Sequence, residues 1–232
     1  MDICLIPARA GSKRIKNKNI ISFFDKPIIS YAIKTAIKSK LFDKVLVTTD
    51  SIKIAKISKN FGAEIPFIRP KKIAGNTSID IEVIEHFLNF SKKQGLKIRY
   101  LCYMYATTPL LKISTLKKCK RLLKESKTEK VITIGKFQTH IEHALKKNKV
   151  TGNIHAREKE KIKKRTQTLT DYYYDASQCY WYDLSKIKNI KNEKIKTKAV
   201  LLKYGEFLDI DTPSDLAQLK EIYKNKFHKL NK

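Results

Sequence analysis

The residues best suited to chemistry lie in a loop that follows a short apolar run, Ile3 to Ile6. The loop begins at Pro7 and carries one glycine, one serine and five cations, which are Arg9, Lys13, Arg14, Lys16 and Lys18. Backbone N–H groups near Gly11 and Ser12 can point at phosphate oxygens, and the cations offset phosphate charge. The loop therefore predicts a polyphosphate site after a first strand. It matches neither the dinucleotide motif G-x-G-x-x-G nor the P-loop motif.

Two carboxylates near the other end of the sequence form a second group, in the segment Phe207-Leu-Asp-Ile-Asp211. We expect Phe207–Ile210 to be a strand, so that Asp209 and Asp211 share one face. An inward-pointing Asp209 would be costly without a cation nearby. Two carboxylates at the carboxyl edge of a sheet, facing the cationic loop, suit Mg²⁺ when a triphosphate supplies the other ligands. Mn²⁺ could take the same place.

The residues after this acidic pair offer a structural alternative. Thr212 is suited to the N-cap of a helix, Pro213 to its first position and Asp215 to the third position of a capping box. We therefore expect a helix over Pro213–Tyr223. A turn from strand to helix explains Thr212 and Asp215 well, but it does not explain Asp209.

A third group of polar side chains lies in Lys164-Arg-Thr-Gln-x-Leu169 and in Tyr173-Tyr-Asp-Ala-Ser-Gln-Cys-Tyr-Trp181. Arg165 is well suited to grip a carboxylate through two parallel hydrogen bonds. Gln178 and Tyr180 sit two apart, on one face of a strand, and could meet sugar hydroxyls or N-acyl groups. Trp181 points the other way, and we expect it in the core.

The segments that position these groups alternate between strand and helix up to about residue 135. Asp50 is expected to cap the second helix and Gly62 to stop it. This alternation predicts an α/β fold, a mostly parallel sheet with helices on both faces, which binds ligands at the carboxyl ends of its strands. The expected strands are Ile3–Ile6, Lys44–Thr48, Glu64–Phe67, Tyr100–Tyr105 and Val131–Ile134, and the expected helices are Pro27–Lys38, Ile52–Phe61, Ser78–Phe90 and Ser114–Leu123.

The alternation stops near residue 137, where charged and turn-rich sequence predicts an arm over about 137–170. Aromatic strands are expected at Tyr172–Tyr182 and Val200–Tyr204. We expect a single domain over 1–226 that carries this arm, followed by a basic tail over 227–232.

The formal net charge of +28 raises the question of nucleic-acid or anionic-membrane binding. Only seven of the 50 basic residues are Arg, and the Lys residues are spread along the whole chain. A nucleic-acid face usually relies on Arg for planar, bidentate contacts. We therefore predict no nucleic-acid partner and no membrane partner, and interpret the charge as a bias of composition.

The four cysteines, which are Cys4, Cys102, Cys119 and Cys179, form no C-x-x-C pair and no metal-ligand spacing. Buried thiols in a reducing compartment are the expectation. The sequence has no apolar run of transmembrane length and no signal-peptide pattern, so we expect a cytoplasmic protein.

The cationic loop and the end of the strand before it resemble the opening of the cytidylyltransferases that activate sialic-acid-like sugars. This segment reads Ile6-Pro-Ala-Arg-Ala-Gly-Ser-Lys-Arg-Ile-Lys-Asn-Lys-Asn19. Their motif is Ile-Pro-Ala-Arg-x-x-Ser-Lys-x-Ile-x-x-Lys-Asn. The related ketodeoxyoctonate enzymes usually end it in Lys-Pro. This resemblance speaks against an ordinary basic surface turn. It spans roughly residues 1–220 and implies a Rossmann-like nucleotidyltransferase.

Two later segments resemble the pseudaminic acid branch of this family. Tyr105-Ala-Thr-Thr-Pro109 stands where sialic acid enzymes have Gln-Pro-Thr-Ser-Pro, and Asp175-Ala-Ser-Gln-Cys-Tyr-Trp181 stands where they have Asn-Gly-Ala-x-Tyr. The segment His140-Ile-Glu-His-Ala-Leu145 departs from that branch, which often has Pro-Ile-Gln-Arg-Ala-Leu. The choice among N-acyl variants of the sugar therefore stays open.

The resemblance implies transfer of CMP from CTP to a nine-carbon sugar acid, with release of pyrophosphate. It implies that the triphosphate is held by Arg9, Ser12, Lys13 and Lys18, of which Arg9 and Lys18 are the catalytic candidates. Asn19 would lie near the nucleoside. The remaining implied roles are metal ligation by Asp209 and Asp211, and sugar binding by Arg165, Gln167, Gln178 and Tyr180.

Arg69-Pro70 and the following Ala74-Gly-Asn-Thr77 resemble the family segment Arg-Pro-x-x-Leu-Ala-x-Asp. The resemblance implies that Arg69 contacts the cytosine ring, and a guanidinium can donate to the O2 and N3 acceptors of cytosine. The arm resembles the dimerisation element of the family, which implies a homodimer whose arm reaches toward the partner's site.

Two alternatives stay open from the sequence. One is a cytidylyltransferase for N-acetylneuraminate, legionaminate or ketodeoxyoctonate. The other is a non-enzymatic nucleic-acid-binding protein that uses the charge of +28.

Overall fold

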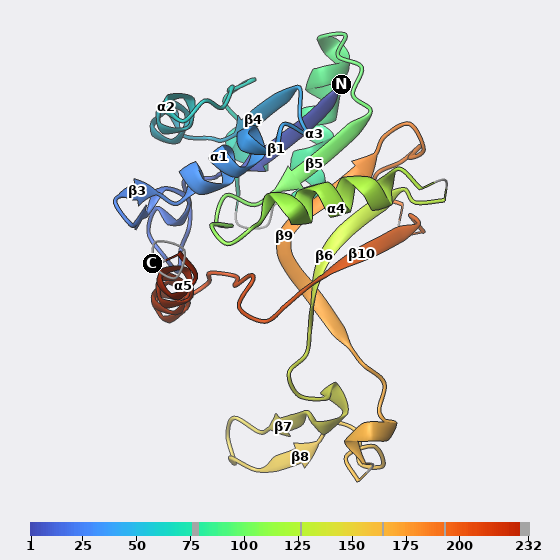
Figure 1. The fold of residues 1–232 in the computed structure, drawn as a ribbon. Helices are drawn as coiled ribbons and strands as arrows, with labels where there is room; N and C mark the ends of the chain where they lie inside the picture. Colours follow the sequence, from blue (N-terminus) through green and yellow to red (C-terminus); the bar gives the residue numbers. More distant parts are fainter. Residues whose placement is uncertain (76–78, 126, 164, 193, 228–232) are drawn as a thin grey trace.

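The computed structural model describes residues 1–75, 79–125, 127–163, 165–192 and 194–227. Within these residues a six-stranded sheet has the order β10-β6-β9-β5-β1-β4 (Figure 1). β1 pairs in parallel with β4 and β5, and β10 pairs in parallel with β6, whereas β9 runs antiparallel to both of its neighbours. The strands are β1 (Asp2–Pro7), β4 (Lys44–Thr48), β5 (Tyr100–Met104), β6 (Lys130–Lys136), β9 (Tyr173–Asp183) and β10 (Thr197–Leu202).

Helices cover both faces of the sheet, as the alternating sequence pattern predicts. Alternate side chains of β1 enter opposite cores, since Cys4 and Ile6 belong to one apolar cluster and Ile3 and Leu5 to another. The first cluster includes apolar residues of α1 (Ile29–Ser39), α2 (Ile52–Asn60) and α4 (Ile113–Leu123), and the second includes those of α3 (Asp80–Lys93). The predicted α/β fold is therefore confirmed, and Trp181 lies fully in the core against Phe42.

The expected cap at the start of α2 is wrong, and the expected glycine at its end is confirmed. Ser51, not Asp50, caps this helix, because the Ser51 side chain accepts a hydrogen bond of 3.3 Å from the Ile54 N–H. Gly62 follows the helix with a φ of +94°, a conformation that favours glycine. Asp50 makes a different contact, which helps to build the cleft described below.

Two predicted strands are corrected. Phe207–Ile210 is not a strand; it is an irregular segment between β10 and α5 (Pro213–Phe227). Ile210 is buried in a separate apolar cluster with Ile15 and Leu219, which draws this segment away from the sheet edge. Glu64–Phe67 is reduced to isolated bridges at Glu64 and Ile68, because Pro66 within the segment lacks the N–H that a ladder needs.

The predicted cap of α5 is confirmed. The Asp215 N–H donates to the Thr212 hydroxyl oxygen at 3.2 Å, and the Asp215 carboxylate accepts from the Thr212 N–H at 2.7 Å. The same carboxylate accepts from the Asp211 N–H at 2.9 Å. The capping box therefore fixes the backbone of the acidic segment.

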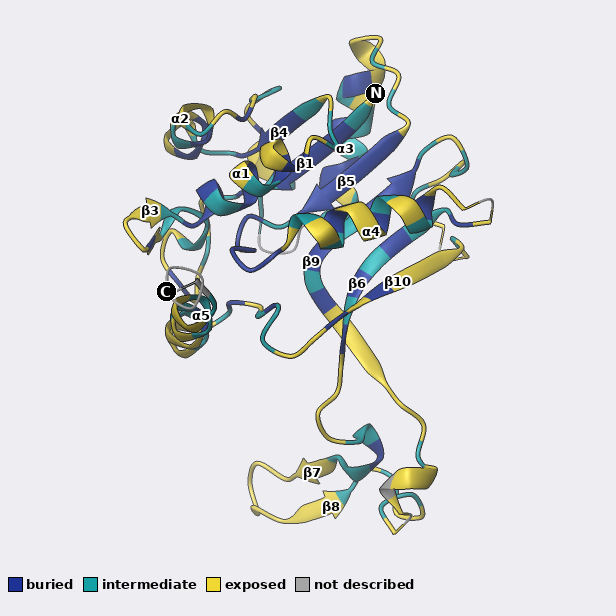
Figure 2. Ribbon diagram, viewed as in Figure 1, coloured by how far each residue is buried: buried dark blue, intermediate teal, exposed yellow. Residues whose placement is uncertain are grey.

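An arm protrudes from the body between β6 and β9, and most of it is exposed (Figures 1 and 2). It contains an antiparallel hairpin of β7 (Leu145–Lys147) and β8 (Ile154–Ala156). A smaller hairpin of β2 (Ser22–Phe23) and β3 (Lys26–Pro27) lies in the body. The 3-10 turns are η1 (Lys18–Ile20), η2 (Lys71–Ile73), η3 (Ile141–His143) and η4 (Thr166–Thr168).

The four cysteines, all among the described residues, are buried free thiols. Among the helices that the structure describes, none is both long and apolar enough to span a bilayer. The predicted basic tail over 227–232 lies, apart from the last residue of α5, outside the described residues.

Candidate active site

A cleft of about 490 Å³ opens where β1 and β5 end, at the carboxyl edge expected for a ligand of such a sheet. The N-terminal cationic loop forms one wall, and the acidic segment before α5 forms another. Arg69 and two tyrosines of the β5 end line the remaining surface. The lining residues used below are Arg9, Ser12, Lys13, Arg14, Lys18, Asn19, Arg69, Asp80, Tyr103, Tyr105, Ser177, Asp209 and Asp211.

Contacts to other parts of the chain fix the cationic loop. The Ala10 N–H donates to Asp50 Oδ1 at 2.8 Å, and Asn19 Nδ2 donates to the Arg9 carbonyl at 2.9 Å. Arg9 Nη1 donates to the Gly75 carbonyl at 2.7 Å. Asp50 is thus a positioning residue that the sequence pattern misassigned as a helix cap. The position of Asp50 directly after a predicted strand was the feature of the sequence that could have indicated this role.

One expectation about the loop backbone is corrected. The Ser12 N–H donates to the Ala10 carbonyl at 2.9 Å, so this donor is engaged within the loop. The Ser12 side chain still lines the cleft. The Ser12 N–H is therefore not available to an anion, whereas the cationic side chains of Lys13 and Lys18 line the cleft.

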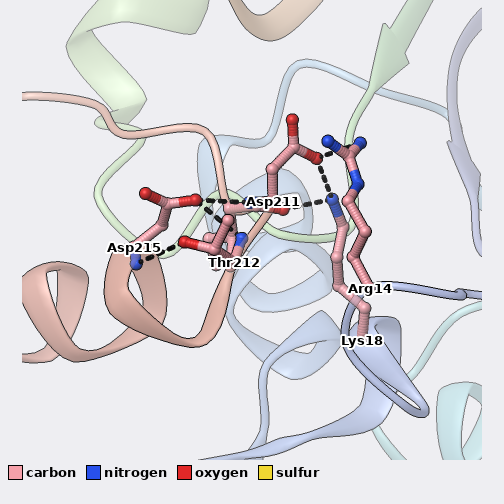
Figure 3. Close-up of polar contacts among 6 residues, drawn as sticks. Arg14, Lys18, Asp211, Thr212 and Asp215 are labelled. Atoms are coloured by element: carbon pink, nitrogen blue, oxygen red, sulfur yellow. Dashed lines mark hydrogen bonds and ion pairs between the residues drawn. The ribbon is translucent and has the colours of Figure 1, made fainter. Parts of the chain in front are cut away.

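The cationic loop and the acidic segment meet directly (Figure 3). Arg14 Nη2 lies 2.6 Å from Asp211 Oδ1, and Lys18 Nζ lies 3.5 Å from the same oxygen. Lys18 also donates to the Ile210 carbonyl, 192 residues further along the chain. The two ends of the sequence therefore face each other across one cleft, as the polyphosphate-and-metal prediction requires.

Asp209 lines the cleft beside this ion pair. Its residue is exposed to solvent, yet the concave surroundings displace enough water that desolvation raises the pKa of its carboxyl. Lys18 opposes this shift and Asp211 adds to it. A carboxylate held in such surroundings gains from a nearby cation.

The carboxylates of the cleft suit Mg²⁺ or Mn²⁺ only if a bound ligand supplies further oxygen atoms to the same ion. Within the described residues there is no group of three or more His, Cys, Asp or Glu side chains placed to hold a metal. Asp209 and Asp211 supply carboxylate oxygens alone, and Mg²⁺ commonly uses one or two carboxylates together with substrate phosphates. The residues present are therefore suited to a metal that arrives with a triphosphate.

Arg69 is the most unusual cation of the cleft. Its residue is only 4% exposed, and its Nε and Nη2 have no hydrogen-bond partner among the described residues. Desolvation lowers the pKa of the guanidinium, while Tyr103 and Asp50 oppose that shift. Buried donors without partners are costly, so the position is suited to a ligand that supplies acceptors.

A network of tyrosines and carboxylates begins at Asp80, Tyr103 and Tyr105, which line the cleft, and continues to Tyr180 and Asp175, which are not among its lining residues. Tyr103 donates to Asp80 Oδ1 at 2.8 Å, and Tyr105 donates to Asp80 Oδ2. The Tyr180 hydroxyl donates to Asp175 Oδ2 at 2.7 Å and lies 3.4 Å from that of Tyr105. Asp80 was missed from the sequence because a helix start explains an acidic residue equally well.

A β-bulge brings Ser177 into the cleft. The register of β9 against β6 shifts between Ile132 and Ile134, and Ser177 has a φ of +49°, which is rare for a non-glycine residue. The Ser177 N–H donates to Asp175 Oδ1 at 2.8 Å. Gln178, predicted to bind the sugar, is buried, and its Nε2 donates to the carbonyls of Ala176 and Ser177.

The remaining predicted residues lie elsewhere. Arg165 and Gln167 are exposed on the arm and are not among the residues that line the cleft. Lys164 of the same motif, and Asn76 and Thr77 of the segment after Arg69, lie outside the described residues.

A sheet of this topology, with a cationic strand-end loop and an acidic pair across one cleft, defines a nucleotidyltransferase. The chain belongs to the cytidylyltransferase family, whose model matches residues 3–231.

Three relatives illustrate the breadth of the match. The chain is 31% identical over 225 residues, 96% of each protein, to a pseudaminic acid cytidylyltransferase of Campylobacter jejuni subsp. jejuni serotype O:2. It is 31% identical over 115 residues, half of each chain, to a CMP-N,N'-diacetyllegionaminic acid synthase of Legionella pneumophila. An N-acylneuraminate cytidylyltransferase of Escherichia coli O18:K1:H7 is 41% identical over 87 residues, 38% of this chain and 20% of the relative.

Solved structures support the fold. A CMP:2-keto-3-deoxy-manno-octonic acid synthetase complexed with CTP has a TM-score of 0.69 at 14% identity, covering 97% of this chain and all of the other. A 4-diphosphocytidyl-2C-methyl-D-erythritol synthase has a TM-score of 0.65 at 14% identity, covering 96% and 97%.

Proposed function

We propose that this protein transfers CMP from CTP to a nonulosonic acid, with pseudaminic acid as the preferred acceptor, and releases pyrophosphate. The main support for this proposal is that the loop containing Arg14 and Lys18 contacts the Asp209–Asp211 segment within one cleft. Similarity to a pseudaminic acid cytidylyltransferase over 96% of both chains supports this sugar. N-acetylneuraminate, legionaminate and ketodeoxyoctonate are the alternative acceptors.

In this reaction the anomeric hydroxyl oxygen of the sugar attacks the α-phosphorus of CTP. A new P–O bond forms, the bond from the α-phosphorus to the bridging oxygen breaks, and pyrophosphate leaves after taking up the proton of the hydroxyl. Arg9, Ser12 and Lys13 hold the triphosphate, and Lys18 offsets the charge that develops on the leaving pyrophosphate. Positioning and electrostatic stabilisation carry most of the acceleration in such displacements.

The same proposal assigns the remaining cleft residues. Asp209 and Asp211 would hold Mg²⁺, or Mn²⁺, which would supply further positive charge beside the phosphates. Asn19 lies near the nucleoside. The unpartnered donors of Arg69 face the O2 and N3 acceptors of cytosine, which explains why a buried guanidinium is retained here.

We further propose a homodimer in which the arm of one chain reaches the cleft of its partner. Arg165 and Gln167, exposed on the arm, would then meet the sugar carboxylate in the partner's site. Exposed apolar side chains on the arm, among them Leu145 and Ile154, support an interface. The reaction belongs in the cytoplasm, where reduced thiols such as the four buried cysteines persist.

Incubation of the purified protein with CTP, Mg²⁺ and each sugar acid in turn tests the proposal. We expect the largest kcat/KM with pseudaminic acid, measured as pyrophosphate release. A larger value with another acid would reassign the acceptor and keep the enzyme class.

The charge of +28 is the one observation that favours a nucleic-acid-binding protein. Tight retention of single-stranded or duplex DNA at physiological salt, together with no pyrophosphate release from any acid, would favour that function instead.

A further inference from the structure

The acidic segment before α5 is fixed at two points that lie in different apolar clusters. Ile210, on one side of Asp209, is buried in a cluster that includes Ile15 of the cationic loop. Phe207, on the other side, is 9% exposed and belongs to the cluster that α1, α2 and α4 share with the sheet. Asp209 is itself exposed, so the position of its backbone depends on these two buried neighbours.

Phe207 reaches the root of the arm. Its ring centre lies 5.8 Å from that of Tyr174, the second residue of β9. The ring centre of Tyr174 lies 5.0 Å from that of Phe137, which directly follows β6. The arm leaves the body between these two strands (Figure 1). The aromatic rings therefore connect the acidic segment to both strands that carry the arm.

Gly135 leaves the space that the Phe207 ring occupies. Gly135 is buried in β6, where it pairs with Tyr174 of β9 and Leu202 of β10. A Cβ atom at this position would lie 2.3 Å from Phe207 Cζ and 2.9 Å from Tyr174 Cζ, well inside van der Waals contact. Gly135 has no positive φ, so the close approach of the two rings, rather than backbone conformation, explains the glycine.

We propose that Phe207 is a positioning residue for Asp209, and that Gly135 and Tyr174 form the socket that holds the Phe207 ring. A buried ring two residues before a carboxylate restricts where that carboxylate can lie. This inference rests on the proposed function, in which Asp209 would hold a divalent cation beside CTP. It adds that packing at the root of the arm sets the affinity of the cleft for that cation.

The test measures Mn²⁺ binding by water proton relaxation, with CTP present and no sugar acid, so that no turnover occurs. Phe207→Ala should raise the Mn²⁺ dissociation constant about tenfold, the size usual for loss of a group that supports a metal ligand. Phe207→Leu keeps an apolar side chain in the socket and should raise the constant less. The Mg²⁺ concentration that gives half-maximal pyrophosphate release should follow the same order.

Gly135→Ala tests the socket from its other side. The added methyl group should displace the Phe207 ring and weaken Mn²⁺ binding. The same change made together with Phe207→Leu should have a smaller effect, because leucine lacks the two ring atoms that come within 3.1 Å of the added Cβ. Phe42→Ala is the matched control, since Phe42 stacks on Trp181 in the same cluster but does not line the cleft. It should lower stability and leave Mn²⁺ affinity unchanged.

Circular dichroism checks that each variant is folded, and Phe207→Leu and Gly135→Ala provide the comparison where Phe207→Ala does not fold. Wild-type Mn²⁺ affinity in the folded socket variants would overturn the inference and leave the proposed function intact. An equal loss of affinity in Phe42→Ala would also overturn it, because a general loss of stability would then explain the effect. Absence of pyrophosphate release by the wild-type protein with every sugar acid would instead overturn the proposed function, and this inference with it.

Discussion

The cleft and the arm differ in how completely the chain's own contacts determine them. In the cleft, Lys18 meets Ile210 and Asp211, and Ala10 meets Asp50, so residues distant in sequence hold one another in place. On the arm, Leu145 and Ile154 are more than half exposed. One chain therefore positions the residues of the proposed nucleotide site by itself, whereas the proposed sugar contacts of the arm need a second chain.

The largest effect is expected at the acidic pair. Asp209→Asn or Asp211→Asn removes a carboxylate charge beside the phosphates, and we expect kcat to fall about a thousandfold. Circular dichroism and the melting temperature should stay near those of the wild type. Asp25→Asn is the matched control, because Asp25 lies in the β2–β3 turn, and full activity in both cleft variants would refute the metal assignment.

A smaller effect is expected at Arg69. Arg69→Met keeps the volume but removes a buried guanidinium with unpartnered donors, so CTP affinity measured by calorimetry should fall about a hundredfold. The free energy of unfolding without CTP should rise by about 1 kcal/mol, because the buried charge is removed. Arg99→Met, at a guanidinium stacked on Tyr100 outside the cleft, should leave CTP affinity unchanged. Wild-type affinity in Arg69→Met would show that Arg69 does not contact the nucleotide.

The smallest catalytic effect is expected on the arm. Leu145 pairs with Ala156 and Lys147 with Ile154, so Leu145 and Ile154 project from one face of the hairpin. The double change to Asp should raise the dimer dissociation constant at least about tenfold and lower turnover, with CTP binding unchanged. Light scattering measures the dimer, and Ile52→Asp, on an exposed residue of the body, is the control. A monomeric wild-type protein with full turnover would rule out the arm proposal.

The sequence predicts local structure well where the signal is local. The β1 run, the Thr212 and Asp215 cap and the core position of Trp181 each follow from neighbouring residue types, and each is confirmed. These three features depend on periodicity and on short-range hydrogen bonds. The meeting of the Lys18 loop with Asp211 was predicted from opposite charge, although Phe207–Ile210, the strand expected to place Asp211, is irregular.

The wrong expectations depend on tertiary contacts. Phe207–Ile210 has the residue types of a strand, but Ile210 is buried against Ile15 and Leu219 instead. Asp50 is followed by Ser51, an equally good cap, and the position of the Ala10 N–H decided between them. Asp80 accepts hydrogen bonds from Tyr103 and Tyr105, which reach it only in the folded protein.

The contact between Lys18 and the Ile210 carbonyl has a consequence for synthesis of the chain. The last strand of the sheet ends at Leu202, so the sheet can assemble before Ile210 has emerged from the ribosome. Until then Lys18 lacks this oxygen and the ion pair beside it. A nascent chain would therefore fold its sheet first. It would become able to transfer CMP to a sugar only when α5 emerges.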